Sequence, residues 1–193
     1  STKKTLPFLF ELEVINPLTV NMFNTLYYAR QLDDYKQSYS HFEPFFYPLD
    51  KVDGWNKAYG KKGFLQYQFV IPLSAGINAL KAILKTIVSF GNSSFLTVLK
   101  TFGDIKSPGM LSFPREGITV AIDFKMTGNT ILDRLNKSDE IVKSVGGVLY
   151  PAKDARMSPV SFQEFYPQWN EFSKIKDPKF TSGFWERVTR NIL

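Results

Sequence analysis

Residues 64–72 read Phe-Leu-Gln-Tyr-Gln-Phe-Val-Ile-Pro. The alternation of apolar and polar side chains predicts a β-strand that ends at the proline. Ser74 follows and is expected to cap a helix, because apolar residues then recur at helical spacing until Gly91. Residues 94–101 and 118–124 have the composition of two further strands, and the loop between them is rich in glycine and proline.

The alternation of strands and helices continues toward the C-terminus. Asn129 opens a second helix with an apolar face, two glycines at 146–147 end it, and residues 148–150 form a short fourth strand. The order β-α-β-β-α-β predicts an α+β fold with a ferredoxin-like core. In that arrangement both helices cover one face of an antiparallel sheet, and the other face is open to a ligand or another domain. Helices at about 159–173 and 181–192 would form a helical C-terminal tail.

The sequence before the first strand is irregular and rich in aromatic residues. Asn16-Pro17 predicts the start of a helix over about 17–31, since asparagine caps helices and proline suits their first turn. For residues 41–53 we expect an extended, packed segment, because Pro44 and Pro48 oppose a helix there.

Composition excludes several classes of protein. The chain has 193 residues, 44% hydrophobic and 22% charged, as is usual for a folded globular protein. It contains no cysteine and a single histidine, His41, so we expect neither disulfides nor a metal site. No apolar run reaches the roughly 18 residues of a membrane span. The net charge of +6 either favours an anionic partner or serves solubility.

Polar side chains gather on one face of the predicted sheet. Gln66 and Gln68 are two residues apart, so both point to the face opposite Tyr67. Lys100 and Thr119, on the neighbouring strands, extend this polar face. It is either a plain solvated surface or the lining of a ligand site.

A second concentration of functional groups, residues 150–156 (YPAKDAR), follows the fourth strand. Lys153 beside Asp154 and Arg156 is either part of a surface salt-bridge cluster or a site for an anionic substrate or developing negative charge. The dinucleotide-binding GxGxxG, P-loop, HExxH and EF-hand motifs are missing. The order of elements also fits an RNA-recognition module, but residues 117–124 lack its basic-glycine-aromatic pattern.

Several motifs together resemble a known family. They are residues 46–50 (FYPLD), 54–60 (GWNKAYG), 63–72 (GFLQYQFVIP), 94–103 (SFLTVLKTFG), 111–114 (LSFP) and 149–156 (LYPAKDAR). In order and spacing they resemble FAD-linked oxidoreductases of the vanillyl-alcohol-oxidase type, namely those related to decaprenylphosphoryl-β-D-ribose oxidase and to the sugar-lactone and alditol oxidases. The resemblance runs from about Asn16 to the C-terminus and includes Asp177-Pro178.

The resemblance implies that separate domains bind FAD and substrate. The N-terminal domain that holds most of the FAD in this family has no counterpart here, so the chain is expected to be an excised C-terminal portion. Residues 1–147 would be the substrate-binding (cap) domain, and residues 148–193 the segment that packs on the absent FAD-binding domain. Alone, this portion is not expected to hold FAD or to be active.

The resemblance also implies an activity and a set of residues. The complete protein would be an FAD-dependent oxidoreductase that oxidises a hydroxyl of a sugar, a sugar lactone or a polyprenyl-phosphate sugar. Lys153 and Tyr150 would be the catalytic residues next to flavin and substrate. The implied substrate-binding residues are Gln66, Gln68, Lys100, Phe102, Thr119, Tyr27 and Tyr47.

The resemblance further suggests partners and a location. We expect a sugar-type small molecule and the FAD-binding domain as partners, no nucleic acid, and a cytoplasmic protein that associates peripherally with a membrane. The alternative is a non-enzymatic basic binding module for nucleic acid or protein. Convergence of the implied site residues on one surface beside the C-terminal tail would favour the enzyme.

Overall fold

The computed structural model describes residues 4–5, 16–47, 50, 52–91, 94, 96–153 and 156–190. Contacts divide the chain into two compact units. The first unit combines the residues up to Phe64 with 91–95 and 124–127, and the second combines 65–90, 96–123 and 128–193. The predicted functional boundary at 147/148 stays a prediction.

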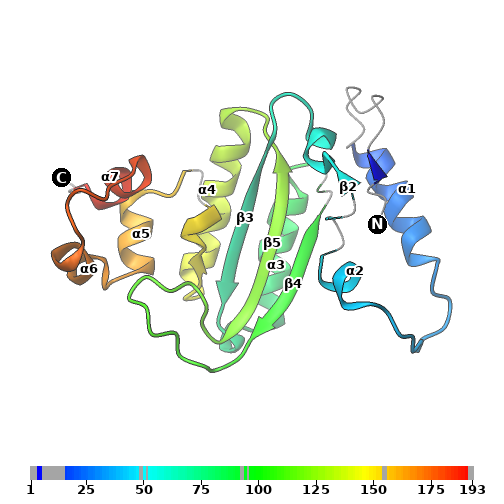
Figure 1. The fold of residues 1–193 in the computed structure, drawn as a ribbon, viewed down its shortest axis with the longest axis horizontal. Helices are drawn as coiled ribbons and strands as arrows, with labels where there is room; N and C mark the ends of the chain where they lie inside the picture. The colour runs from blue at the N-terminus through cyan, green and yellow to red at the C-terminus, as the bar shows by residue number, and fades with distance from the viewer. Residues whose placement is uncertain are drawn as a thin grey trace. The chain divides into compact units, whose positions relative to one another are not determined.

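A four-stranded antiparallel sheet forms the centre of the second unit (Figure 1). Its strands lie in the order β4 (Thr97–Phe102), β5 (Gly117–Lys125), β3 (Phe64–Ile71) and β6 (Val148–Leu149). Helix α3 (Gly76–Val88) connects β3 to β4, and α4 (Asn129–Ser144) connects β5 to β6. Both helices lie on the same side of the sheet (Figure 1). The α+β class is therefore confirmed, with the predicted order of elements.

The strand predicted at 64–71 is present with the predicted bounds and alternation. Leu65, Tyr67 and Phe69 are buried, whereas Gln66 and Gln68 are half-buried on the other face. The buried face packs under the apolar sides of the two helices. That core consists of Leu80, Ile83 and Ile87 of α3, Ile131, Leu135 and Val142 of α4, and Val120 and Ile122 of β5.

The start and the buried face of α3 differ from the prediction. Residues Leu73–Ala75 form a 3-10 turn in which the Ala75 N–H donates to the Pro72 carbonyl at 3.0 Å, so Ser74 lies inside the turn and does not cap the helix. Ile77 and Val88 are two of the apolar residues that recur at helical spacing, and both are exposed because they lie at the two ends of the helix.

Gly117 allows an unusually close approach between two strands. A Cβ atom at this position, where φ is +155°, would lie 2.2 Å from the carbonyl oxygen of Ile71. Only glycine fits there, because any side chain would push β5 away from the end of β3.

The C-terminal tail contains three short helices where two were predicted: α5 (Pro159–Phe165), α6 (Trp169–Ile175) and α7 (Gly183–Thr189). The predicted helix at 159–173 is interrupted at Tyr166, because the following Pro167 disfavours helical backbone in the residue before it. The Tyr166 hydroxyl donates to the Leu149 carbonyl at 2.6 Å, which ties α5 to β6.

The first unit is mostly helix and loop. Helix α1 (Pro17–Tyr28) starts as predicted, with the Asn16 side chain accepting from two backbone N–H groups, and ends three residues early. The expectation of an extended segment at 41–53 was wrong at 42–46, because α2 (Phe42–Phe46) is a helix, and it holds at 52–53, where the chain forms a strand. Pro44 lies in the first turn of α2, where backbone N–H groups have no helical partner and proline is tolerated.

Short elements complete the first unit. Strands β1 (Lys4–Thr5) and β2 (Val52–Asp53) pair in parallel, and Trp55–Tyr59 forms a 3-10 helix. The Tyr59 ring stacks on Phe64 with centroids 4.5 Å apart. None of the helices within the described residues is both long and apolar enough to cross a lipid bilayer.

Candidate functional site

The polar face of the sheet is organised by hydrogen bonds between β3 and β5. The Gln66 amide Nε2 donates to Asp123 Oδ1 at 2.7 Å, and the Gln68 Nε2 donates to the Thr119 hydroxyl at 3.2 Å. Thr119 in turn donates its hydroxyl hydrogen to the Phe69 carbonyl at 2.8 Å. Thr119 and Asp123 are both fully buried, so the two glutamines form the accessible layer of this face.

The edge strand β4 extends the same face. Lys100 pairs with Thr119 and Phe102 pairs with Gly117 in the antiparallel register. Directly paired residues share a face of the sheet. Lys100 is exposed, so its ammonium group is available to a ligand beside the glutamines.

Three aromatic rings form a row beside the polar residues. Phe102 and Phe113 meet edge to face with centroids 6.0 Å apart, and Phe113 stacks on Tyr150 at 4.6 Å and 25°. Phe113 comes from the loop between β4 and β5 and is buried. Sequence reasoning missed it as a site residue; the signal was a lone phenylalanine in a loop of glycine and proline.

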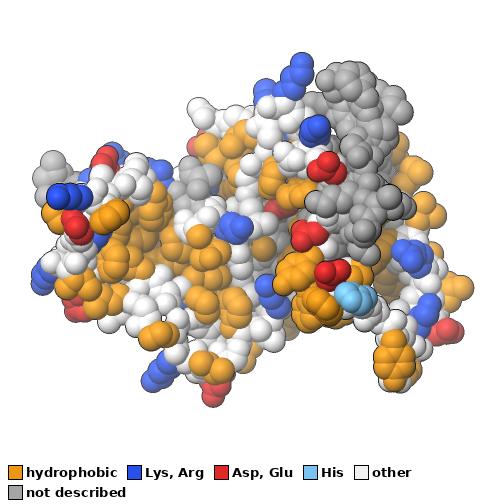
Figure 2. Space-filling view, viewed as in Figure 1, with side chains coloured by type: hydrophobic (Ala, Val, Ile, Leu, Met, Phe, Trp, Pro, Cys, Tyr) orange, Lys and Arg blue, Asp and Glu red, His pale blue; other side chains and the backbone are white. Residues whose placement is uncertain are grey.

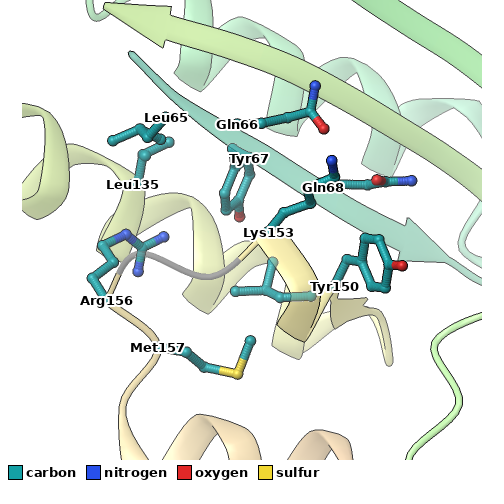
Figure 3. Close-up of a pocket in the computed structure, with 10 residues that line it drawn as sticks. Leu65, Gln66, Tyr67, Gln68, Leu135, Tyr150, Lys153, Arg156 and Met157 are labelled. Atoms are coloured by element: carbon teal, nitrogen blue, oxygen red, sulfur yellow. The ribbon is translucent and has the colours of Figure 1, made fainter. Parts of the chain in front are cut away.

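Lys153 lies at the end of a 3-10 turn, Pro151–Lys153, which directly follows β6. The Tyr150 N–H donates to the Gln68 carbonyl at 2.9 Å, so the turn starts against the middle of β3. Figure 3 shows the Lys153 side chain extending toward Gln68. A hollow of about 20 Å³ lies here, lined by Gln66, Gln68, Tyr150, Lys153, Arg156 and neighbouring apolar residues. That volume holds about one water molecule.

A buried ionic cluster holds the far end of this segment. Arg156 binds the Asp139 carboxylate through both terminal nitrogens, at 2.5 and 2.8 Å, and the Tyr67 hydroxyl donates to the same carboxylate at 2.9 Å. Burial, and then the charge of Asp139, raise the pKa of Tyr67 well above its ordinary value. Sequence reasoning grouped Arg156 with Asp154, which lies outside the described residues; its partner here is Asp139 on α4.

A second cationic contact lies between the β4–β5 loop and the tail. The Arg115 guanidinium lies 5.8 Å from the centre of the Tyr166 ring. Burial raises the pKa of the Tyr166 phenol, and burial lowers the pKa of Arg115. Figure 2 shows hydrophobic side chains gathered over α5 and the neighbouring loop, so this end of the second unit presents an apolar surface.

The second unit brings together most residues that the sequence nominated. The hydrogen bonds, strand pairs, ring contacts and shared hollow described above connect seven of them: Gln66, Gln68, Lys100, Phe102, Thr119, Tyr150 and Lys153. Tyr27 and Tyr47 belong to the first unit and are exposed, and their role at the site stays a prediction. Within the described ranges, no three acidic or histidine side chains are grouped as a metal site requires.

Comparisons with known proteins give two informative matches. Over 172 residues the chain is 37% identical to decaprenylphosphoryl-beta-D-ribose oxidase of Mycolicibacterium smegmatis, covering 89% of this chain and 36% of that protein. Over 118 residues it is 31% identical to an uncharacterized protein in the mprA 5' region of Streptomyces coelicolor, covering 58% of this chain and 31% of that protein. No family model matches the chain.

The first match confirms the resemblance to decaprenylphosphoryl-beta-D-ribose oxidase that was inferred from the motifs. The chain spans about a third of the length of each of these relatives.

Proposed function

We propose that this chain forms the substrate-binding side of an FAD-dependent oxidoreductase that oxidises a hydroxyl of a sugar, a sugar lactone or a polyprenyl-phosphate sugar. The observation that carries the proposal is the convergence of Gln66, Gln68, Tyr150 and Lys153 around one hollow beside β3, which Leu65, Tyr67 and Leu135 of the helix-covered side also line. The relative with 37% identity is named as an oxidase of a polyprenylphosphoryl ribose, which supports the same chemistry.

The side chains of this face suit a flavin ring. Tyr150, backed by Phe113, offers an aromatic surface, and the exposed Lys153 offers a positive hydrogen-bond donor for the polar edge of the isoalloxazine. When bound, FAD supplies the redox chemistry, taking up two electrons and the hydrogen of the substrate C–H bond.

The hollow holds about one water molecule, so a sugar must lie over the polar face instead of inside it. We therefore propose an FAD-binding domain as the partner that covers this face. It would belong to the same protein.

Each residue of the face has a chemical task in this proposal. The Lys153 ammonium donates to the oxygen of the reacting hydroxyl and stabilises the negative charge that develops there as the hydroxyl proton passes to a water molecule. Gln66 and Gln68 orient the remaining hydroxyls, and Lys100 attracts an anionic group such as a phosphate. Phe102 and Phe113 form an apolar wall that limits the entry of water. Tyr27 and Tyr47 would help to close the pocket.

The basic loop with Lys57, Lys61 and Lys62 is the candidate contact with a lipid surface. Lysines near an anionic membrane each contribute about 1 kcal/mol of attraction. Peripheral association of a cytoplasmic protein remains the expectation for a polyprenyl-phosphate substrate.

The test is to purify the protein at its natural length and record its visible absorption spectrum. We expect a bound flavin, which a prenylphosphoryl ribose, a sugar lactone or an alditol bleaches without oxygen. A protein that binds no flavin, even after reconstitution with FAD, would contradict the proposal. Tight binding of nucleic acid by the flavin-free protein would instead support a basic binding module.

A further inference from the structure

We propose that Asp123 and Thr119 are positioning residues that fix the side-chain amides of Gln66 and Gln68 with their carbonyl oxygens directed outward. The polar face then accepts two hydrogen bonds from hydroxyl groups of the bound compound. That this compound is a substrate rests on the proposed function; the orientation of the amides does not.

The orientation of Gln68 follows from the single hydrogen of a threonine hydroxyl. Thr119 donates that hydrogen to the Phe69 carbonyl at 2.8 Å, so toward Gln68 its oxygen can only accept. The group that faces Thr119 must therefore be the amide nitrogen of Gln68, at 3.2 Å. Because Thr119 is fully buried, the surrounding solvent cannot take over either bond.

The orientation of Gln66 follows from its hydrogen bond to a buried carboxyl. The Gln66 Nε2 lies 2.7 Å from Asp123 Oδ1 and donates to it, so the amide nitrogen faces the buried carboxyl. Figure 3 shows this amide nitrogen on the β5 side and the amide oxygen on the opposite side.

The side-chain oxygens of Gln66 and Gln68 thus point outward and can only accept hydrogen bonds, whereas the ammonium group of the nearby Lys153 can only donate them. Gln66 and Gln68 start about 7 Å apart along the strand, so their oxygens bind separate hydroxyls. A ketone oxygen has no hydrogen and cannot bind to either glutamine. An arrangement that keeps its hydrogen bonds through the reaction therefore turns the hydroxyl that becomes oxidised toward Lys153, whose ammonium donates to a hydroxyl and a ketone alike, and turns the hydroxyls that persist in the product toward the glutamines.

The orientation itself can be measured without any turnover. In natural-length protein labelled with ¹⁵N-glutamine, the side-chain amide signals of Gln66 and Gln68 should show slow exchange of the bonded hydrogen. Thr119→Val should release Gln68 alone, and Asp123→Asn should release Gln66 alone, because asparagine can face it with either end. Thr119→Ser keeps the hydroxyl and should preserve the Gln68 signal, and Thr101→Val on β4 is the matched control.

The consequence for selectivity can be measured with a prenylphosphoryl ribose and its monodeoxy analogues. Removing a hydroxyl that binds a glutamine should lower kcat/KM by about tenfold or more, mainly through KM. Thr119→Val should reduce this discrimination at one position and leave it at the other.

An unchanged Gln68 signal in Thr119→Val would overturn the positioning role. Equal use of all deoxy analogues by the unaltered protein would overturn the two-hydroxyl requirement. If no sugar reduces the flavin, the proposed function fails, and the amide signals still decide the orientation.

Discussion

Arg156 forms a bidentate salt bridge with Asp139, with nitrogen–oxygen distances of 2.5 and 2.8 Å, and both side chains are almost completely buried. The pair joins the segment that carries Lys153 to helix α4. Buried ion pairs add little net stability, because removing two charges from water offsets their attraction. We infer that this ion pair fixes the position of the Lys153 segment relative to helix α4.

Breaking this pair from one side should be costly. Asp139→Ala or Arg156→Ala leaves an unpaired buried charge and should lower the free energy of unfolding by about 3–5 kcal/mol, measured by urea denaturation. The double variant Asp139→Leu/Arg156→Met replaces both charges with apolar groups and should recover part of that loss, because only the Tyr67 hydroxyl is then left without its acceptor. If the double variant is as unstable as the single ones, the cost does not come from an unpaired charge.

Phe113 should contribute to the stability of the fold as well as line the proposed site. It is buried between Phe102 and Tyr150, so Phe113→Ala should lower the free energy of unfolding by about 3–5 kcal/mol. Phe180 is exposed, and Phe180→Ala in the same unit should change it by less than about 0.5 kcal/mol. Similar values for the two variants would show that the aromatic row is not packed as described.

Lys153 should matter for turnover and not for folding. Its side chain is exposed, so Lys153→Ala should leave the free energy of unfolding within about 0.5 kcal/mol of the unaltered value. Loss of charge stabilisation should lower kcat by about a hundredfold or more in the flavin-loaded protein. Lys137→Ala, at an exposed position of α4, is the control for the loss of a positive charge. Normal turnover of Lys153→Ala would remove Lys153 from the mechanism.

Two buried phenols predict a loss of stability in alkaline solution. Burial holds the pKa values of Tyr67 and Tyr166 above the ordinary 10.0, so below pH 10 both forms of the chain keep these protons. Above pH 10 the unfolded chain loses them first, and the free energy of unfolding falls as the pH rises.

Urea unfolding at a series of pH values between about 8 and 11.5 measures this decline. It should be shallower in Tyr67→Phe and Tyr166→Phe. The exposed Tyr35 provides the control, because Tyr35→Phe should keep the full decline. An unchanged decline in both buried variants would assign it to other groups.

The local pattern of apolar and polar residues was sufficient to predict the main strands and helices. The strand at 64–71 and the helix beginning at Asn129 appear where alternation and helical spacing predicted them, because their buried faces are continuous. The prediction of an extended segment was wrong at 42–46 because the position of a proline within a helix decides its effect. Pro44 lies in a first turn, and the sequence alone does not show where that turn begins.

The sequence predicted which side chains share the face of the candidate site, but not the distant residues that bind them. Alternation placed Gln66 and Gln68 on one face, but the partners that orient them lie more than fifty residues away. Asp139 was missed although it lies on the buried side of α4 between Leu135 and Val142. A charged residue in that position needs a buried partner, and that requirement was the available signal.

Lys100 lies in β4, the last strand of the sheet in the described part of the chain. An edge strand presents unpaired backbone groups to which a strand of another molecule can add, and a central lysine is a common protection against such pairing. The same ammonium group that is proposed to attract the substrate therefore also opposes aggregation. Replacing it by an apolar residue would put solubility at risk, and a loss of yield could then be mistaken for a loss of function.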